Sequence, residues 1–195
     1  GKGEGAEQEK DQEAGAERIK LLITYVKERL QAEGVSVTTR WVTFCVGGIL
    51  ELRPDLEEDM EEMYTCVRLQ WMDTDLRIPG VTEKPSLPSD LRTWKCAKLR
   101  GRHVLMVMVP TGQVIESEMV LTDGFITVRA IETRPLPQTL SFGSKLEILG
   151  PVTTHLGLLV ISPDQVRVLG GSVEHAEVQE LGSDEQGEQE LGSEE

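Results

Sequence analysis

The sequence is poor in aromatic residues and in cysteine and has no long apolar run, and each shortage excludes a class of protein. Phe, Trp and Tyr together make up 4% of its 195 residues. No apolar run approaches the roughly 18 residues that a membrane-spanning helix needs, so we expect no membrane segment. Cys45, Cys66 and Cys96 are an odd number without a C-x-x-C spacing. This favours buried thiols over a disulfide framework or a zinc knuckle.

The sequence patterns of catalytic and metal-binding sites are missing as well. The chain contains no H-E-x-x-H, G-x-S-x-G or G-x-x-x-x-G-K-[ST] motif. Its three histidines, His103, His155 and His175, are far apart in the sequence and belong to no ligand pattern. We therefore predict that the protein is not an enzyme and holds no metal and no cofactor.

The formal net charge of −14 is concentrated at the two ends of the sequence. Residues 1–17 carry −4 and residues 172–195 carry −9, which leaves −1 for the middle. Both ends are rich in Glu, Gly, Gln and Ser, and such a composition cannot bury enough apolar surface to fold. We predict that both are disordered acidic tails. The second repeats the letters ELGS at 180–183 and 190–193.

Helical periodicity marks the first third of the chain. Apolar residues recur every three or four positions in residues 16–33 and again in residues 38–52, and each segment predicts a helix. The pair Gly47-Gly48 weakens the second prediction, because each glycine costs a helix about 1 kcal/mol relative to alanine.

A third helix is predicted to follow Pro54. Asp55 suits an N-cap, since Glu58 three residues later completes a capping box. Apolar residues at helical spacing then continue as far as Trp71. We predict that the three helices pack as a small bundle over residues 18–75.

Proline and glycine change the character of the chain after the helices. The letters IPGVTEKPSLPSD, residues 78–90, indicate an extended segment. We predict a proline-rich connector over residues 76–97. Leu76, Ile78 and Leu87 are its candidates for pinning the connector to the neighbouring domain.

The second half of the chain switches to a period of two, which is typical of strands. The pair Asp123-Gly124 predicts a tight hairpin turn there, because glycine adopts a positive φ without strain. The predicted strands cover residues 98–109, 116–124, 125–132, 144–152 and 155–162, and residues 165–171 are a candidate sixth strand. Their number and short connections predict a five-stranded OB-type β-barrel over residues 98–171, and hence an α+β fold.

A small β-barrel can also bind single-stranded DNA or RNA by itself, and this is an alternative function. Such binding uses a basic groove and aromatic rings on which the bases stack. Residues 98–171 contain seven Lys or Arg and only two phenylalanines, Phe125 and Phe142. We expect nucleic-acid contact to be weak or indirect, and Phe125 to be a core or rim residue of the barrel.

Several motifs in a fixed order resemble those of a known family. W-x-x-x-C, TDLR, LPSD and KLRG-x-x-VL come first, and LTDG, G-S-K-x-x-x-x-G and V-x-VLGG-x-V follow. Over residues 18–175 this order resembles the RecQ-mediated genome instability family, which is related to the Tudor-domain adaptor of topoisomerase III beta.

The resemblance implies a non-catalytic accessory subunit. In that family an OB-fold subunit binds topoisomerase III, a type IA topoisomerase, together with a RecQ-type helicase. The assembly promotes decatenation and the dissolution of double Holliday junctions in the nucleus. The resemblance also implies a second small OB-fold subunit as a partner.

In that family a loop between the first two barrel strands reaches the DNA gate of the topoisomerase, and its counterpart here is much shorter. A loop of about seven residues spans at most roughly 25 Å, which favours binding to the topoisomerase surface over control of its gate. We predict partner binding by the loop residues Thr111, Gly112, Gln113, Val114, Ile115 and Glu116. Val114 and Ile115 are apolar anchors in this hypothesis; alternatively, they begin the second strand.

Lys145 is the other residue that the resemblance predicts to bind a partner. It matches the lysine of the G-[ST]-K motif and would pair with an acidic patch of that partner. The alternative is an exposed lysine without a specific role.

Overall fold

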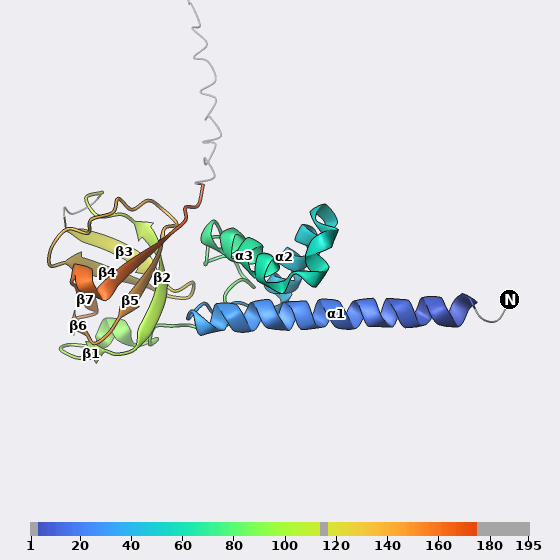
Figure 1. Ribbon diagram of the computed structural model, residues 1–195. Helices are drawn as coiled ribbons and strands as arrows, with labels where there is room; N and C mark the ends of the chain where they lie inside the picture. The colour runs from blue at the N-terminus through green and yellow to red at the C-terminus, as the bar shows by residue number, and fades with distance from the viewer. Residues whose placement is uncertain (1–3, 114–116, 175–195) are drawn as a thin grey trace, which may run out of the picture.

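The computed structural model describes residues 4–113 and 117–174. Its fold is α+β, with three α-helices followed by an eight-stranded β-sheet (Figure 1). In these two segments, no helix is long and apolar enough to cross a membrane. The predicted loop residues Val114, Ile115 and Glu116 lie outside the described residues, as does the acidic tail from residue 175 onward.

Helix α1, Glu4–Ala32, begins much earlier than the sequence indicates. The predicted disorder of residues 1–17 is wrong from residue 4 onward. This segment is rich in Glu, Gln, Ala and Lys, which are strong helix formers, and the side chains of residues 5–17 are almost all exposed. Helix propensity rather than burial therefore extends α1, whose N-terminal half continues past the other helices (Figure 1).

Helix α2, Thr39–Leu52, confirms the second predicted helix. The hydroxyl oxygen of Thr38 caps it by accepting a hydrogen bond of 3.1 Å from the Trp41 amide. Gly47 and Gly48 are exposed, and a Cβ atom added to either would meet nothing within 4 Å. Packing inside the chain therefore does not require glycine at these two positions.

Helix α3, Met60–Met72, starts later than predicted. Pro54 opens a short 3-10 helix, η1, that ends at Glu58, and the α-helix begins only after it. The N-cap is accordingly Asp59, whose carboxylate accepts from the Glu62 amide at 3.1 Å, and the prediction of Asp55 is wrong. Asp55 and Glu58 both lie inside η1, which opens with Pro54, so they do not cap the α-helix that follows.

The connector lies along the folded core for most of its length. Leu76 and Leu87 are buried as predicted, whereas Ile78 is 52% exposed, so the prediction for Ile78 is wrong. Val81 and Leu91 are buried instead, the latter in the short 3-10 helix η2, Leu91–Thr93. The connector thus contributes apolar residues to the core despite its prolines.

The sheet contains eight strands, whereas the sequence predicts five or six. They are β1 (Lys98–Leu99), β2 (Arg102–Val109), β3 (Glu118–Thr122), β4 (Thr127–Glu132), β5 (Lys145–Leu149), β6 (Val152–His155), β7 (Leu158–Ile161) and β8 (Val166–Gly170). The count rises because Gly101, with a φ of 88°, separates β1 from β2, and Pro151 separates β5 from β6. Proline cannot donate to a ladder, and glycine favours a break in a strand.

The strand order is β1-β6-β7-β4-β3-β2-β5-β8. Strands β2, β3 and β4 form an antiparallel meander, and β5 pairs with the other edge of β2. The single parallel pair among the described strands joins β4 to β7. The hairpin predicted from Asp123-Gly124 is confirmed by the pairing of Thr122 with Thr127.

Strand β2 belongs to two apolar cores at once. Val104 and Met106 face the helices, in a core with residues such as Val26 of α1. Leu105 and Val107 point to the opposite face and pack in the interior of the sheet. The period of two in a strand separates these two faces, so β2 joins the helical part to the sheet.

The cysteines only partly match the prediction of buried thiols. Cys45 is buried, and burial raises the pKa of its thiol to about 11. Cys66 is half-buried and Cys96 is exposed, so the prediction is wrong for Cys96. Cys96 lies where the connector runs into β1, a short strand that leaves its preceding residues near the surface.

Candidate functional site

The described half of the predicted partner-binding loop turns sharply at the end of β2. The Gln113 amide closes the turn on the Pro110 carbonyl at 3.4 Å, and Gly112 has a φ of 87°. The Thr111 hydroxyl donates to Oε1 of Glu132 at 3.1 Å. This hydrogen bond connects the loop to the C-terminal end of β4. Thr111, Gly112 and Gln113 therefore lie where β2 and β4 end, at one end of these strands.

A second loop, residues 133–143, lies at the same end of β2 and β4. The chain reverses direction between β2 and β3 and again between β3 and β4, so the segments that follow β2 and β4 emerge together. The two loops enclose a groove of about 200 Å³, which we call the loop-end groove. It is lined by Pro110, Thr111, Glu132, Pro135, Leu136, Gln138, Thr139 and Leu140.

Sequence reasoning missed the contribution of the second loop to this site. Two prolines and the lack of strand periodicity marked residues 133–143 as a loop, and the Asp123-Gly124 turn predicted the meander. Together they were sufficient to place both loops at one end of the strands. The hydrogen bond between Thr111 and Glu132 could not be predicted, because it depends on side-chain geometry.

Lys145 is not at the surface, and the prediction that it contacts a partner is not supported. It is fully buried, and its ammonium group donates to the carbonyl oxygens of Met72 at 2.8 Å, Thr74 at 2.7 Å and Gly143 at 2.9 Å. Burial lowers the pKa of Lys145 to about 8. The match to the G-[ST]-K motif predicted an accessible side chain, whereas the end of α3 covers it.

The Asp123-Gly124 turn binds the connector. The Asp123 carboxylate accepts from the amides of Phe125 and Ile126 in its own turn, at 2.9 and 3.0 Å. Its second oxygen accepts from the amides of Ser86 at 3.0 Å and Leu87 at 2.9 Å. The turn was predicted to serve geometry rather than partner contact, and its buried carboxylate explains why an acid is needed there.

A close approach makes glycine necessary beside this carboxylate. Gly124 has a φ of 98°, and a Cβ atom on it would lie 2.6 Å from the Leu76 carbonyl oxygen. The next residue, Phe125, is 53% exposed, so it is a rim residue. The whole turn therefore packs against the connector. It lies at the end of β3 and β4 opposite to the loop-end groove.

The described histidines have structural surroundings rather than catalytic ones. His103 lies 2.9 Å from the Ser86 hydroxyl through Nδ1 and 2.8 Å from the Arg100 carbonyl through Nε2. Nδ1 of His155 lies 3.9 Å from the sulfur of Cys96. Residues 4–113 and 117–174 contain no group of three or more His, Cys, Asp or Glu side chains that could hold a metal ion.

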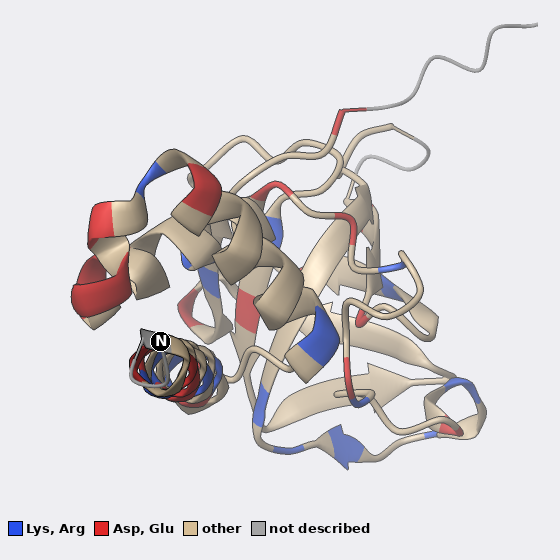
Figure 2. Ribbon diagram, turned by 90° about the vertical axis from the view of Figure 1, so that its right-hand side faces the viewer, with Lys and Arg blue, Asp and Glu red and all other residues tan. Residues whose placement is uncertain are grey.

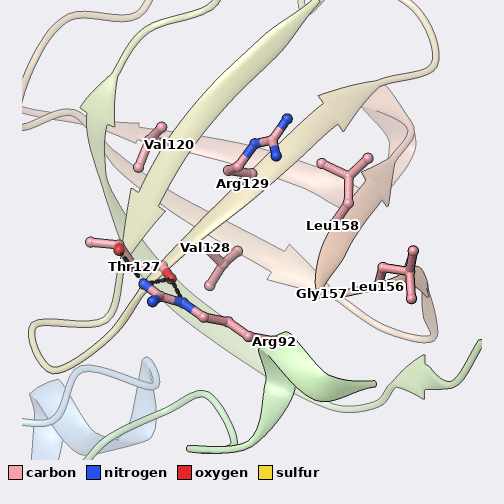
Figure 3. A pocket seen from close by; sticks show the side chains of 8 residues that line it. All are labelled: Arg92, Val120, Thr127, Val128, Arg129, Leu156, Gly157 and Leu158. Atoms are coloured by element: carbon pink, nitrogen blue, oxygen red, sulfur yellow. Dashed lines mark hydrogen bonds between the residues drawn. The ribbon is translucent and has the colours of Figure 1, made fainter. Parts of the chain in front are cut away.

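A larger groove of about 370 Å³ crosses strands β3, β4 and β7 (Figure 3). It is lined by Arg92, Val120, Thr127, Val128, Arg129, Leu156, Gly157 and Leu158, and these eight residues include no aromatic ring. Arg92 donates to the carbonyl and hydroxyl of Thr127 at 2.9 and 2.7 Å. Arg129 binds Glu118, and its hydrogen bond lowers the pKa of that carboxyl group. Both guanidinium groups of the groove therefore already have partners.

Comparison with known proteins first defines the class of the sheet region. A family model described as RMI1, N-terminal OB-fold domain, matches residues 116–182. The parallel pair of β4 with β7 next to an antiparallel meander agrees with this description. The sheet region from β3 onward is therefore similar to an OB-fold domain.

Longer matches then extend to the helices. RecQ-mediated genome instability protein 1 of Mus musculus is 25% identical over 179 residues, which cover 72% of this chain and 29% of the mouse protein. The Xenopus laevis protein of the same name is 27% identical over 185 residues, covering 72% of this chain and 31% of its own length. Tudor domain-containing protein 3 of Xenopus tropicalis is 32% identical over 120 residues, which cover 53% of this chain and 16% of the Xenopus protein.

The chain is similar to RecQ-mediated genome instability protein 1, and the resemblance of its motifs to that family is thereby confirmed. It spans less than a third of the length of these curated relatives. The relation to Tudor domain-containing protein 3 also agrees with the motifs.

Proposed function

We propose that this chain is a non-catalytic accessory subunit in genome stability. In this proposal it binds topoisomerase III with a RecQ-type helicase and a second small OB-fold subunit in the nucleus. It promotes decatenation and the dissolution of double Holliday junctions there. The observation that carries the proposal is its match to RecQ-mediated genome instability protein 1 over 72% of the chain.

The loop-end groove supports the binding part of this proposal. Its floor contains the half-buried Leu136 and Leu140, while Gln138 and Thr139 are exposed on its rim. Apolar surface framed by polar groups is the usual composition of a protein interface. The hydrogen bond between Thr111 and Glu132 holds the two loops together before a partner arrives, which lowers the entropy lost on binding.

We further propose that β7 and β8 together act as the fifth strand of an OB barrel. They are separated only by the short 3-10 helix η3, Pro163–Gln165. Strand β7 pairs with β4, and β8 pairs with β5, so the two halves bridge opposite sides of the sheet. In this arrangement the loop-end groove lies at one mouth of the barrel.

Recovery of purified topoisomerase III on the immobilised chain tests the binding proposal. The first variant replaces residues 111–115 with Gly and Ser, and the second carries Thr139→Arg on the opposite rim of the groove. We expect each to reduce recovery by at least about tenfold, which corresponds to about 1.4 kcal/mol of binding free energy. The matched control is Phe125→Ser, since Phe125 is also exposed and lies in the turn between β3 and β4, away from the loop-end groove.

Two outcomes would contradict the proposal at different levels. If the unaltered chain recovers no topoisomerase III, the accessory-subunit function is wrong for this chain. If both groove variants recover as much as the unaltered chain, the partner binds elsewhere on the surface. A decatenation assay with the recovered complex then checks whether binding stimulates the topoisomerase. The chain alone is expected to show no decatenation activity in this assay.

The alternative function, independent binding of single-stranded DNA or RNA, would use the groove of Figure 3. Arg92 and Arg129 provide positive charge, but each is already held by a neighbouring group. Single-strand binding also draws on aromatic stacking, and no ring lines this groove. The alternative predicts salt-sensitive binding of an oligonucleotide that Arg92→Ala and Arg129→Ala weaken without any effect on topoisomerase recovery.

A further inference from the structure

The outward face of α2 exposes two large apolar side chains. Phe44 is 80% exposed and Leu52 is 84% exposed, the highest values among the large apolar residues of the described chain. Gly47 and Gly48 lie between them and are exposed on the same face. Single exposed apolar residues are common at protein surfaces. Two of them separated by bare backbone instead form a flat apolar strip, which we call the α2 strip.

The fold itself gives no reason for the glycines of the α2 strip. Neither has a positive φ, and a Cβ atom on either would enter open space. Glycine weakens the interior of a helix relative to alanine. A glycine that its own chain does not require leaves room for another backbone to approach closely. The missing Cβ atoms therefore point to a neighbour outside the chain.

Charges frame the α2 strip with opposite signs. Arg40 lies toward the N-terminal end of α2 and Glu51 toward the C-terminal end, both on the exposed face. In the described part of the chain neither side chain has an ion pair or a hydrogen bond. One apolar residue and one charge lie on each side of Gly47-Gly48: Phe44 and Leu52 are at similar distances from the pair, whereas Arg40 lies farther from it than Glu51 does.

We propose that the α2 strip binds the α2 strip of a second copy of this chain in an antiparallel pair. The two glycine pairs meet at a two-fold axis, each Phe44 packs beside the partner copy's Leu52, and each Arg40 reaches the partner copy's Glu51. A two-fold contact requires a self-complementary surface, and this strip has one. The antiparallel arrangement also places the positive end of one helix dipole beside the negative end of the other.

The charge distribution favours this occupant over a parallel pair or an acidic partner. Acidic residues gather where α2 ends and α3 begins, as the red segments of Figure 2 show, and they include Glu51, Glu57 and Glu58. A parallel pair would set these acidic ends against each other. In an antiparallel pair each acidic end meets the end that carries Arg40.

One helix-to-helix contact is small for a permanent dimer. Stable interfaces bury about 1,200–2,000 Å² in total, and a pair of helices as short as α2 offers less. We therefore expect a weak dimer in reversible exchange with the monomer. This inference does not depend on topoisomerase binding, because α2 and the loop-end groove belong to different parts of the fold.

Sedimentation velocity of the full chain, over about a hundredfold range of concentration, tests the proposal because mass action shifts a weak dimer within such a range. The unaltered chain is expected to sediment faster as its concentration rises. The double variant G47A/G48A should have a higher thermal midpoint, because alanine favours the helix, yet associate at least about tenfold more weakly. These opposite changes separate a role in contact from a role in folding.

A charge exchange identifies the antiparallel geometry. R40E and E51R should each lose association, because like charges then face each other twice across the axis. An equimolar mixture of R40E with E51R should recover it, since both ion pairs form again, one with its original signs and one with its signs reversed. Leu69→Ser is the matched control, because Leu69 is an exposed apolar residue on another helix and should leave association unchanged.

Three results would overturn the proposal. The unaltered chain could remain monomeric over the whole range, which would leave the strip to a different protein. G47A/G48A could associate as tightly as the unaltered chain, which would remove the glycines from the contact. The mixture of R40E and E51R could fail to associate although each variant is folded by circular dichroism, which would exclude the antiparallel pairing.

Discussion

Two regions of this molecule treat their polar groups in opposite ways. At the junction between helices, connector and sheet, Asp123 and Lys145 are buried and satisfy seven backbone groups between them. At the loop-end groove, Gln138 and Thr139 face solvent. The junction resembles a protein interior, and the groove resembles an unoccupied interface.

This difference in burial indicates that the polar residues of the junction stabilise the fold, whereas those of the groove are available for binding. Buried polar groups stabilise a fold only when they are fully paired, and no buried side-chain nitrogen or oxygen of the described residues lacks a partner. Exposed polar groups on a rim cost little to leave in water and remain available for a partner. Substitutions at the junction should therefore affect folding, and substitutions at the groove should affect binding.

The largest effect is expected from Asp123→Ala. Four backbone amides lose a charged acceptor in a buried turn, and the connector is released from the hairpin. We expect the free energy of unfolding to fall by about 4 kcal/mol, since a hydrogen bond to a charged group contributes about 1.5–3 kcal/mol and such effects are not additive. Urea denaturation measures it, with Asp90→Ala, an exposed connector aspartate, as the control.

A somewhat smaller loss is expected from Gly124→Ala. The new methyl group would lie 2.6 Å from the Leu76 carbonyl oxygen at a φ of 98°, so the turn and the connector must separate. We expect a loss of about 2–3 kcal/mol, the usual scale for a strained backbone position. Gly112→Ala has a similar φ but open space around it, so it should cost less in the same urea titration. Equal losses for the two variants would show that the close contact is unimportant.

Lys145→Met should cost about 2 kcal/mol at neutral pH, because three carbonyl oxygens lose their donor while the apolar stem is retained. Unfolding in urea measures this loss. Lys84→Met, at an exposed lysine of the connector, is the control and should be almost neutral. A loss no larger than that of the control would show that the ammonium group does not hold α3 to β5.

The stability contribution of Lys145 should also depend on pH. Its pKa is lowered from 10.5 to about 8 by burial, so the unfolded chain binds more protons between these two values. The free energy of unfolding of the unaltered chain should therefore rise, relative to Lys145→Met, as the pH increases from 8 toward 10.5. Below pH 8 the difference should be constant. A relative loss of stability over this window would contradict the lowered pKa.

The smallest effect on folding is expected at the loop-end groove. Thr139→Arg replaces an exposed side chain, so the free energy of unfolding should change by no more than about 0.5 kcal/mol. The same variant is expected to lose most topoisomerase recovery. If Thr139→Arg lowers both the free energy of unfolding and topoisomerase recovery, Thr139 contributes to folding as the junction residues do. The proposed separation between folding residues at the junction and binding residues at the groove would then be wrong.

Local signals predicted most of the sheet but could not predict what covers it. Alternating apolar residues located the strands, and Asp123-Gly124 located the hairpin. The prediction for Lys145 was wrong because a motif match does not show what covers a residue, and the ammonium group of Lys145 is held by the end of α3, about seventy residues earlier in the chain. Asp59 was missed for a similar reason, since Pro54 and Asp55 open a 3-10 turn with signals that an α-helix also uses.

The candidate site was half predictable for a different reason. The resemblance to a family indicated the loop that contains Thr111, and the topology implied a second loop beside it. The groove between them depends on the path of residues 133–143, which supply Pro135, Leu136, Gln138, Thr139 and Leu140 to its lining. Such a path follows from the packing of the whole domain rather than from the letters of one segment.

The double membership of β2 has a consequence for how this protein loses its structure. Val104 and Met106 hold the helices, and Leu105 and Val107 hold the interior of the sheet, so neither core can open without disturbing the strand that serves the other. Helices and sheet should accordingly protect their amides from hydrogen exchange to a similar degree and melt in a single cooperative transition. A fragment cut at the connector would keep its strands and yet expose an apolar stripe to solvent. The helices therefore cover the apolar residues Val104 and Met106 of β2 and keep them from solvent.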